Sequence, residues 1–503
     1  MYILGIHNAN DSGVCLIKNN KVLESISEER INRKKMYSGF PHLSLNLILK
    51  KYKIPLKKID FFAYGWCGKL NKITDYNLRY CKRMEEEVKR NKNNLKLIKE
   101  RTETEASRDN FVRQKFDEEC DKLKIPKKKI IYIDHHQSHA WSAFSCSPFS
   151  KSLIFTLDAR GDLRSGLVAY ADIKSGIVEK DYLVSAFDGL GFLYGQITDY
   201  LGFTPQKHEG KVTGLAAFGN HKKTIKIFKN IIEFKNGKIK CKLGDYRPFF
   251  TNMSKPLKRK LSKHKAKDIA AGLQKHCEDI IVQWIKFWLK KSKSPQNICL
   301  AGGVFGNVRF NQKVAEIKGV KNMYVFPHMA DGGIPYGSAA LASFQKTGRA
   351  KITFKDMYSG SKFNSTEILR ELRKNKKKIL FKRLSNKSKF VAEKLLENKI
   401  IGIFNGRMEY GPRALGNRSI IANARDKKIN DWLNKRLNRT EFMPFAPVTP
   451  SEFANKCYKN WKINHVASKF MTRTYDCFKE FALNHPAVVH IDGTARPQII
   501  SRT

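Results

Sequence analysis

Two similar stretches of this chain each predict a strand, a polar loop, a second strand, a tight turn and a third strand. The first covers residues 3–23 and has its polar loop at Asn10-Asp11-Ser12-Gly13. The second covers residues 153–178 and carries Asp158 and Asp162 in the corresponding loop. A repeated unit of this kind indicates a duplicated α/β fold with two related halves.

A duplicated unit of hairpins suggests the actin-like, sugar-kinase-like ATPase architecture, in which a nucleotide lies between the two halves. Two strand–glycine–helix segments agree with that expectation. The apolar run 297–301 leads into Gly302-Gly303, and Asp331-Gly332-Gly333 precedes a helix of small residues. Glycines after a strand let backbone N–H groups approach a phosphate or ribose, although a single Gly-Gly pair is more often a plain turn. The candidate nucleotide-binding residues are Gly302, Gly303, Asn307 and Gly332.

A pair of histidines predicts a metal site. His135 and His139 stand four residues apart, which places both imidazoles on one face of a helix. Asp158 ends a buried strand and Asp331 follows another, so both carboxylates are expected at strand ends that face a crevice. The predicted ligands are His135, His139, Asp158 and Asp331, with a first-row divalent ion such as Fe²⁺ rather than calcium. Two alternatives are a solvated, histidine-rich helix start and a ligand set in which His136 replaces His135.

A set of motifs runs along nearly the whole chain, from Gly5 to Gln498. The motifs are Asn10-Asp11-Ser12, Ser27-Glu28-Glu29-Arg30, the His135/His139 pair, Leu157-Asp158, residues 208–216, Ala301-Gly302-Gly303-Val304, Asp331, residues 406–419, Pro444-Phe445-Ala446-Pro447 and residues 490–496. In these motifs the chain resembles the O-carbamoyltransferase family of antibiotic and nodulation-factor tailoring enzymes. The long ordered run at 406–419 is the most specific of them.

The resemblance implies two catalytic modules. Residues 1–348 would form an actin-like module similar to the catalytic subunit of tRNA threonylcarbamoyl transfer, with an iron site and a charged, solvent-exposed helical insertion at 75–130. Residues 349–503 would form a smaller α/β module similar to threonylcarbamoyl-adenylate synthase. The smaller module would make carbamoyl adenylate from carbamoyl phosphate and ATP, with Mg²⁺ accompanying the ATP. The larger module would move the carbamoyl group to a hydroxyl of a small-molecule or sugar acceptor.

The candidate residues for binding carbamoyl phosphate and the adenylate lie in the smaller module. Arginine forks bind phosphate with two parallel hydrogen bonds and stay charged when partly desolvated. In a chain this basic, a solvated face would also explain the arginines, but their spacing with glycine and asparagine favours a binding site. The set is Arg407, Arg413, Asn417, Arg418, His490 and Arg496.

The candidate catalytic residues are His208, Glu209, Lys211 and Asp11. His208 has the most suitable unperturbed pKa for a base that deprotonates the acceptor. It could instead contact the adenylate or position Lys211. The family usually has His-Asp where this chain has Asn10-Asp11, and Asn10 cannot accept a proton at neutral pH.

The carboxyl terminus predicts an incomplete small module. The family continues into a further segment with an Asn-Thr-Ser-Phe-Asn motif, whereas this chain ends at Thr503. A sheet cut short exposes an apolar face and an unpaired edge. We therefore expect weak adenylate synthesis and protease sensitivity beyond Lys351.

Composition and charge limit the classes of partner and location that the protein can have. The 96 basic and 46 acidic residues give a net charge of +50, which fits a nucleic-acid partner or an anionic substrate. Because lysine is spread along the chain without one basic tract, compositional drift explains it better. The alternative function is a tRNA-modifying relative or a catalytically impaired nucleic-acid-binding homologue. The sequence has neither an apolar run near 18 residues nor a secretion signal, and its ten cysteines form no CxxC motif, so a cytoplasmic protein is expected.

Overall fold

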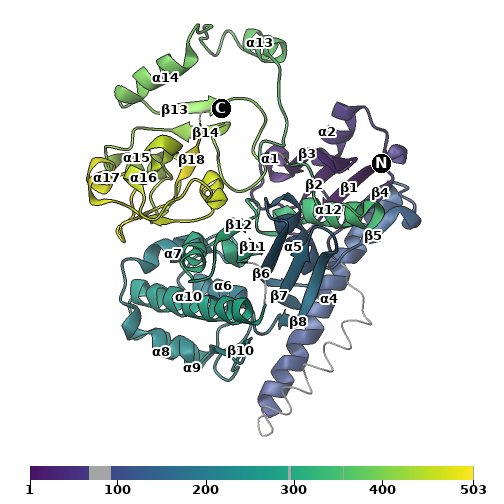
Figure 1. Ribbon diagram of the computed structural model, residues 1–503, viewed down its shortest axis with the longest axis vertical. Coiled ribbons are helices and arrows are strands. Elements are labelled where there is room, and N and C mark those ends of the chain that lie inside the picture. The colour runs from purple at the N-terminus through teal and green to yellow at the C-terminus, as the bar shows by residue number, and fades with distance from the viewer. Residues whose placement is uncertain (67–91, 293–295, 355, 502–503) are drawn as a thin grey trace.

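The computed structural model describes residues 1–66, 92–292, 296–354 and 356–501 (Figure 1). Its amino-terminal part contains a five-stranded sheet in the order β3-β2-β1-β4-β5. Strands β1 to β3 are antiparallel neighbours, and β4 and β5 continue parallel to β1. The strands are β1 (Tyr2–His7), β2 (Gly13–Lys18), β3 (Lys21–Ser27), β4 (Phe61–Tyr64) and β5 (Ile130–Tyr132).

A second five-stranded sheet repeats this topology. Its order is β12-β11-β6-β7-β8, with an antiparallel β6-β7-β8 meander and β11 and β12 parallel to β6. The strands are β6 (Lys151–Gly161), β7 (Arg164–Asp172), β8 (Gly176–Ser185), β11 (Asn297–Ala301) and β12 (Asn322–Val325). The predicted duplication is therefore confirmed, and this part of the chain has the actin-like α/β fold.

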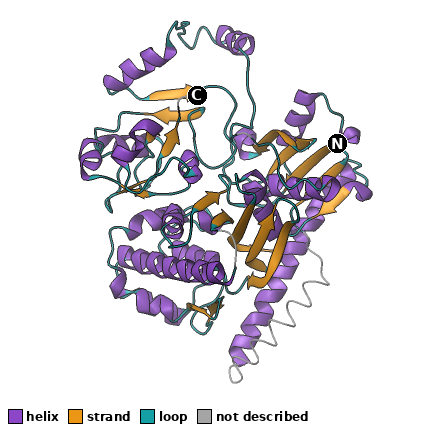
Figure 2. Cartoon of the chain, viewed as in Figure 1, coloured by secondary structure: helices purple, strands orange, loops and turns teal. Residues whose placement is uncertain are grey.

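Two helices lie between the sheets, and each packs on the sheet of the other half (Figures 1 and 2). Helix α5 (His135–Cys146) follows β5 but packs on β6, β11 and β7; α12 (Ile334–Thr347) follows β12 but packs on β1, β2 and β4. They also pack on one another, and small residues allow this approach. A Cβ on Gly337 would lie 1.9 Å from the Ser138 carbonyl oxygen.

The second half also carries a helical layer. Helix α10 (Ala266–Lys291) is amphipathic, and it buries Ile269, Leu273 and Trp284 in the larger core. The other elements of the two halves are α1 (Glu29–Asn32), α2 (His42–Tyr52), α6 (Leu190–Tyr200), α7 (Glu209–Ala216), α8 (Ile225–Lys229), β9 (Ile232–Lys235), β10 (Lys238–Cys241), α9 (Lys255–Leu261) and α11 (Val308–Ala315).

The carboxyl-terminal part consists of short elements around two-stranded sheets. A small core of its own includes Tyr458, Trp461 and Tyr475. The elements are α13 (Ser365–Lys374), α14 (Lys387–Leu396), β13 (Ile401–Phe404), β14 (Arg418–Ile421), α15 (Lys428–Arg436), β15 (Val448–Pro450), α16 (Ser451–Cys457), β16 (Tyr475–Asp476), α17 (Lys479–Asn484), β17 (Thr494–Ala495) and β18 (Gln498–Ile500).

The expected insertion differs from its prediction. Part of the 75–130 segment lies outside the described residues, but α4 (Lys92–Lys122) is a long helix with a buried charged face rather than a fully solvated one. Arg160 from β6 donates at 2.7 Å to both Glu105 and Asp109 of α4. The guanidinium of Arg101, which also pairs with Glu105, lies between aromatic rings of the second half. The high charge of this segment suggested a solvated helix, but several of its charged residues form buried ion pairs.

Removing Arg160 should test this docking. Arg160→Met leaves Glu105 and Asp109 buried without their main cation, so the free energy of unfolding should fall by about 3–5 kcal/mol. Lys115→Met, which breaks an exposed pair with Glu118 on the same helix, should cost less than about 1 kcal/mol. Urea denaturation measures both. Equal small losses in the two variants would show that the buried network does not hold α4.

Among the described residues, none of the helices is long and apolar enough to cross a lipid bilayer.

Candidate functional site

The predicted metal ligands converge on one point between the two sheets. His135 and His139 lie one turn apart on α5, Asp158 comes from β6, and Asp331 from the turn before α12. One ligand atom from each of the four lies within 4.8 Å of the others. His139 Nε2 is 3.1 Å from Asp158 Oδ2, and His135 Nε2 is 3.5 Å from Asp331 Oδ1.

The cluster has the chemistry of a divalent-metal site. Burial lowers the pKa of His135, but the carboxylates of Asp331 and Asp158 outweigh it and raise that pKa to about 10. Burial alone would raise the pKa of Asp331, but His135, His139 and His7 hold it well below the usual value. Neither ring nitrogen of His135 has a hydrogen-bond partner among the described residues. Two imidazoles and two carboxylates facing one point fit a first-row ion better than calcium.

His136 does not belong to this cluster, so the alternative ligand set is wrong. Its Nδ1 lies 3.0 Å from the Thr156 hydroxyl and its Nε2 lies 3.1 Å from the Arg164 carbonyl oxygen. Burial holds the pKa of His136 well below its usual value. Its ring is therefore neutral and fills a structural position behind the site.

Two aromatic residues beside the cluster were missed by the sequence analysis. His7, at the end of β1, places Nε2 3.9 Å from Asp331 Oδ2, and burial lowers its pKa to about 4. Trp66 packs edge-on against His135 with ring centroids 4.7 Å apart. The duplication could have identified His7, because β1 is the counterpart of β6 and Asp158 lies near the end of β6.

Asp11 lies in the same region, in the loop after β1. Burial raises its pKa to about 7, and the negative charges of Glu29 and Asp331 contribute in the same direction. The amide of Asn10 instead donates to Gln206 at 2.5 Å. A carboxyl group with a pKa near neutrality is a candidate base.

The predicted glycine turn adjoins the metal cluster. Gly302 has φ +98°, and a Cβ on Gly303 would lie 3.1 Å from Asp158 Oδ1. Asn307 caps α11, because its side-chain oxygen accepts from the N–H groups of Arg309 and Phe310. Gly332 provides room for the His328 ring, since a Cβ there would lie within 2 Å of that ring. Gly302 and Gly303 are thus brought to the site, whereas Asn307 and Gly332 have structural contacts.

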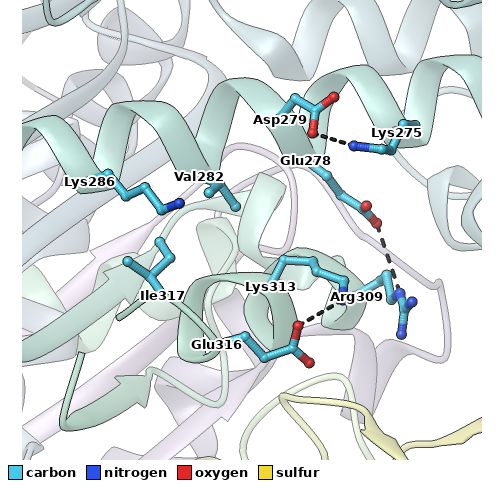
Figure 3. Close-up of a pocket in the computed structure, with 9 residues that line it drawn as sticks. All are labelled: Lys275, Glu278, Asp279, Val282, Lys286, Arg309, Lys313, Glu316 and Ile317. Atoms are coloured by element: carbon cyan, nitrogen blue, oxygen red, sulfur yellow. Dashed lines mark hydrogen bonds and ion pairs between the residues drawn. The ribbon is translucent and has the colours of Figure 1, made fainter. Parts of the chain in front are cut away.

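A cavity of about 460 Å³ lies between α10 and α11 (Figure 3). Arg309 and Glu278 face each other across it at 4.0 Å, and Lys313 pairs with Glu316 at 2.7 Å. Helix α11 begins directly after the glycine turn, so the cavity and the turn share one structural element.

Two of the other predicted catalytic residues, Glu209 and His208, have different surroundings. Glu209 is near Asp158, and burial together with that carboxylate raises its pKa. His208 accepts from the Thr204 N–H through Nδ1, and its charged neighbours are Lys211 and Glu441. Its pKa is lowered, first by burial.

Three of the predicted phosphate-binding residues hold the loop 406–419 together. Arg407 donates to the backbone carbonyls of Leu23, Ser359 and Gly360, which ties this loop to the first half. Arg418 donates to the Asn405 carbonyl at 2.7 Å, and Asn417 donates to the Arg407 carbonyl at 2.7 Å. These donors are therefore already engaged.

Glu409 organises the same loop and was not selected from the sequence. Its Oε1 accepts from the N–H groups of Leu415, Asn417 and Arg418 at 2.8 to 3.0 Å. The Glu409 side chain is 4% exposed. We regard it as a positioning residue for the loop.

The remaining predicted residues form a cationic cluster. Arg413 and Arg496 are partly buried, and the Nε atom of each is enclosed without a hydrogen-bond partner among the described residues. Burial lowers the pKa of Arg413 to about 10, and burial with the charges of Arg413 and Arg439 lowers that of Arg496 well below its usual range. Glu441 is the acidic neighbour of both. Enclosed guanidinium groups with an unpaired Nε are candidates for binding an anion.

His490 is nearly buried and pairs with Asp492 through Nδ1 at 3.5 Å. Its Nε2 has no hydrogen-bond partner in the described part of the chain. His490 therefore keeps one ring nitrogen for a ligand.

The family description carbamoyltransferase N-terminus matches residues 2–340, and carbamoyltransferase C-terminus matches residues 392–503. The chain belongs to the carbamoyltransferase family. Such a protein is a transferase, and the His/Asp cluster lies within the first match and the arginine cluster within the second.

Relatives in several organisms align with most of this carbamoyltransferase. An uncharacterized protein of Methanocaldococcus jannaschii is 31% identical over 99% of the chain and 89% of its own length. Nodulation protein NolNO of Sinorhizobium fredii is 29% identical over 98% of the chain and 70% of its own length. Nodulation protein NolO of Bradyrhizobium diazoefficiens is 30% identical over 74% of the chain and 68% of its own length.

Solved structures resemble the carbamoyltransferase only distantly. HypF of T. kodakarensis aligns with 69% of this chain and 48% of its own, at 11% identity and a TM-score of 0.37. Component A of (R)-2-hydroxyglutaryl-CoA dehydratase from Acidaminococcus fermentans aligns with 69% of this chain and all of its own, at 14% identity and the same TM-score.

Proposed function

We propose that this carbamoyltransferase is an ATP-dependent O-carbamoyltransferase with two reaction sites. The supporting observation is the presence of two separate polar centres, the His/Asp cluster and the arginine cluster, in one chain of this family. We assign the first centre to residues 1–348 and the second to residues 349–503.

The first reaction would make carbamoyl adenylate at the arginine cluster. Water hydrolyses carbamoyl phosphate to carbamate and inorganic phosphate. An oxygen of the carbamate then attacks the α-phosphorus of ATP, and pyrophosphate leaves. Arg413 and Arg496 would bind the anions, and His490 would donate or accept through its open Nε2. Mg²⁺ would accompany ATP as its usual counter-ion.

The second reaction would take place at the His/Asp cluster. His135, His139, Asp158 and Asp331 would hold a divalent ion, for which we propose Fe²⁺, and the bound ion would polarise an oxygen of the adenylate. The acceptor hydroxyl attacks the carbamoyl carbon, its proton passes to Asp11, and AMP leaves. Asp11 has a pKa of about 7 and Asp331 among its charged neighbours, so it is the better candidate base than His208, whose charged neighbours include Glu441 of the smaller module.

The glycine turn and the cavity beside it would hold the nucleotide. Gly303 would let a phosphate or ribose approach the backbone next to Asp158, whereas Gly302 allows the turn to pack on the Leu157 backbone. The adenosine would then extend along α11 into the cavity of Figure 3, where Glu278 can accept from ribose hydroxyls.

The acceptor would be a small molecule or sugar that carries a hydroxyl group. The nodulation proteins among the relatives fit that class. Because ATP and carbamoyl phosphate are intracellular metabolites, we place the reaction in the cytoplasm. The net charge of +50 supports RNA as a second candidate acceptor.

An exchange assay tests the proposal without knowledge of the acceptor. Incubation with ATP, Mg²⁺ and labelled pyrophosphate should return label to ATP only when carbamoyl phosphate is present. Mass spectrometry should detect carbamoyl adenylate. Exchange that does not depend on carbamoyl phosphate would contradict the first reaction, and carbamoylation of tRNA but not of sugars would identify RNA as the acceptor.

The pH dependence of transfer tests the role of Asp11. Below a pH of about 7 its carboxyl group is protonated and cannot accept a proton; above that pH it is a carboxylate. The transfer rate from supplied carbamoyl adenylate should therefore rise as the pH passes through about 7. The positive charges of Arg30 and Lys35 lower the pKa of Asp11, but burial outweighs them. Asp11→Asn should lower the rate by about 10²–10⁴-fold and abolish the rise.

Asp121→Asn changes an exposed carboxylate of α4 and should leave the profile intact. A wild-type profile in Asp11→Asn would exclude Asp11 as the base.

A further inference from the structure

A lysine of the larger module reaches the anion site of the smaller one. Lys211 lies on α7 and is 8% exposed. Its Nζ donates to the Thr440 hydroxyl at 2.7 Å and lies 5.7 Å from the centre of the Phe203 ring. Thr440 is flanked in sequence by Arg439 and Glu441, which are the charged neighbours of Arg413 and Arg496.

The contact between α7 and this segment is closely packed. A Cβ on Gly214 would lie 2.8 Å from the Met443 side chain and 3.1 Å from that of Phe442. The Phe442 ring also meets the Phe203 ring edge-on, with centroids 6.2 Å apart. The Lys211 ammonium is thus held at Thr440, between the two charged residues that neighbour the arginine cluster.

The charges around this point are unequal. Arg413, Arg439, Arg496 and Lys211 contribute four positive charges, whereas Glu441 contributes one negative charge. Arg439 is 45% exposed and pairs with Glu441 at 3.8 Å, so it forms the rim of the site. An excess of about three charges beside enclosed guanidinium groups matches a pyrophosphate or triphosphate group better than a single phosphate.

We propose that Lys211 is a ligand of the polyphosphate of ATP, so that the phosphate site is built from both modules. This inference rests on the proposed function of the arginine cluster and assigns Lys211 to the first reaction instead of the second. The ammonium donates to Thr440 in the free protein, and two further N–H groups remain to bind phosphate oxygens.

Pyrophosphate binding to the full chain tests this assignment without catalysis. Titration calorimetry should show that Lys211→Met lowers the affinity for pyrophosphate by at least about tenfold, as expected for a lost charge-assisted contact. The affinity for inorganic phosphate should fall less. Lys211→Arg should restore most of the affinity. Lys207→Met removes an exposed lysine of the same loop and should bind as the wild type does.

The variants separate the two proposals. Wild-type affinity in Lys211→Met, together with lost binding in Arg413→Ala, would overturn the role of Lys211 and leave the arginine site intact. Wild-type affinity in both would overturn the phosphate site itself. Should Lys211→Met fail to fold, Lys211→Gln decides the question, because it keeps a donor to Thr440 without the charge.

Discussion

His139→Ala should remove the metal from the purified protein. The variant loses one of two imidazoles in a set of four ligands, so bound iron or another divalent ion should fall from about one equivalent to less than about a tenth. Carbamoyl transfer should fall by at least about a thousandfold, because the lost polarisation corresponds to several kcal/mol of transition-state stabilisation. Pyrophosphate exchange, which takes place at the other centre, should persist. Elemental analysis and the two separate assays measure these effects.

His136→Gln is the matched control for that variant. It alters a neighbouring histidine of α5 that points away from the cluster, and its amide can still donate to the Arg164 carbonyl. Metal content should be unchanged. Metal retained at full stoichiometry in His139→Ala would refute the ligand set, and loss of exchange in a folded variant would refute the two-site scheme.

Arg413→Ala should have the opposite effect on the two activities. The variant loses a guanidinium whose enclosed Nε is unpaired among the described residues, so carbamoyl-phosphate-dependent exchange should fall by about 10²–10³-fold. Transfer from supplied carbamoyl adenylate should stay near the wild-type rate. Because the charge of Arg413 also lowers the pKa of Arg496, its removal relieves repulsion in the folded state, and the variant should be as stable as the wild type.

Arg436→Ala provides the comparison, since Arg436 is exposed on α15. It should retain full exchange. Parallel losses in Arg413→Ala and Arg436→Ala would indicate that only the general positive charge of the surface matters.

The duplicated fold and the convergence of His135, His139, Asp158 and Asp331 were predictable from patterns visible in the sequence. The repeated hairpin unit is visible in the sequence, and the separation of four positions between His135 and His139 places both on one face of any helix. The two acids required only that strands end at the same edge of a sheet.

The arginines of the loop 406–419 show what sequence cannot provide. Arg407, Arg413 and Arg418 have the same chemistry, but Arg407 and Arg418 donate to backbone carbonyls, whereas the enclosed Nε of Arg413 has no hydrogen-bond partner among the described residues. The difference arises from backbone carbonyls contributed by distant segments, such as Leu23. Whether α4 is solvated depended likewise on Arg160, a residue more than 50 positions away from Glu105.

The exchange of α5 and α12 between the sheets bears on how the protein is assembled. Each sheet obtains its inner covering from the sequence of the other half, so the inner apolar face of each sheet stays uncovered when one half is synthesised alone. The amino-terminal half must therefore wait on the ribosome, or with a chaperone, until Ile334–Thr347 has emerged. Fragments divided in the loop between α5 and β6 should each aggregate when expressed separately and recover a native complex only when they are produced together.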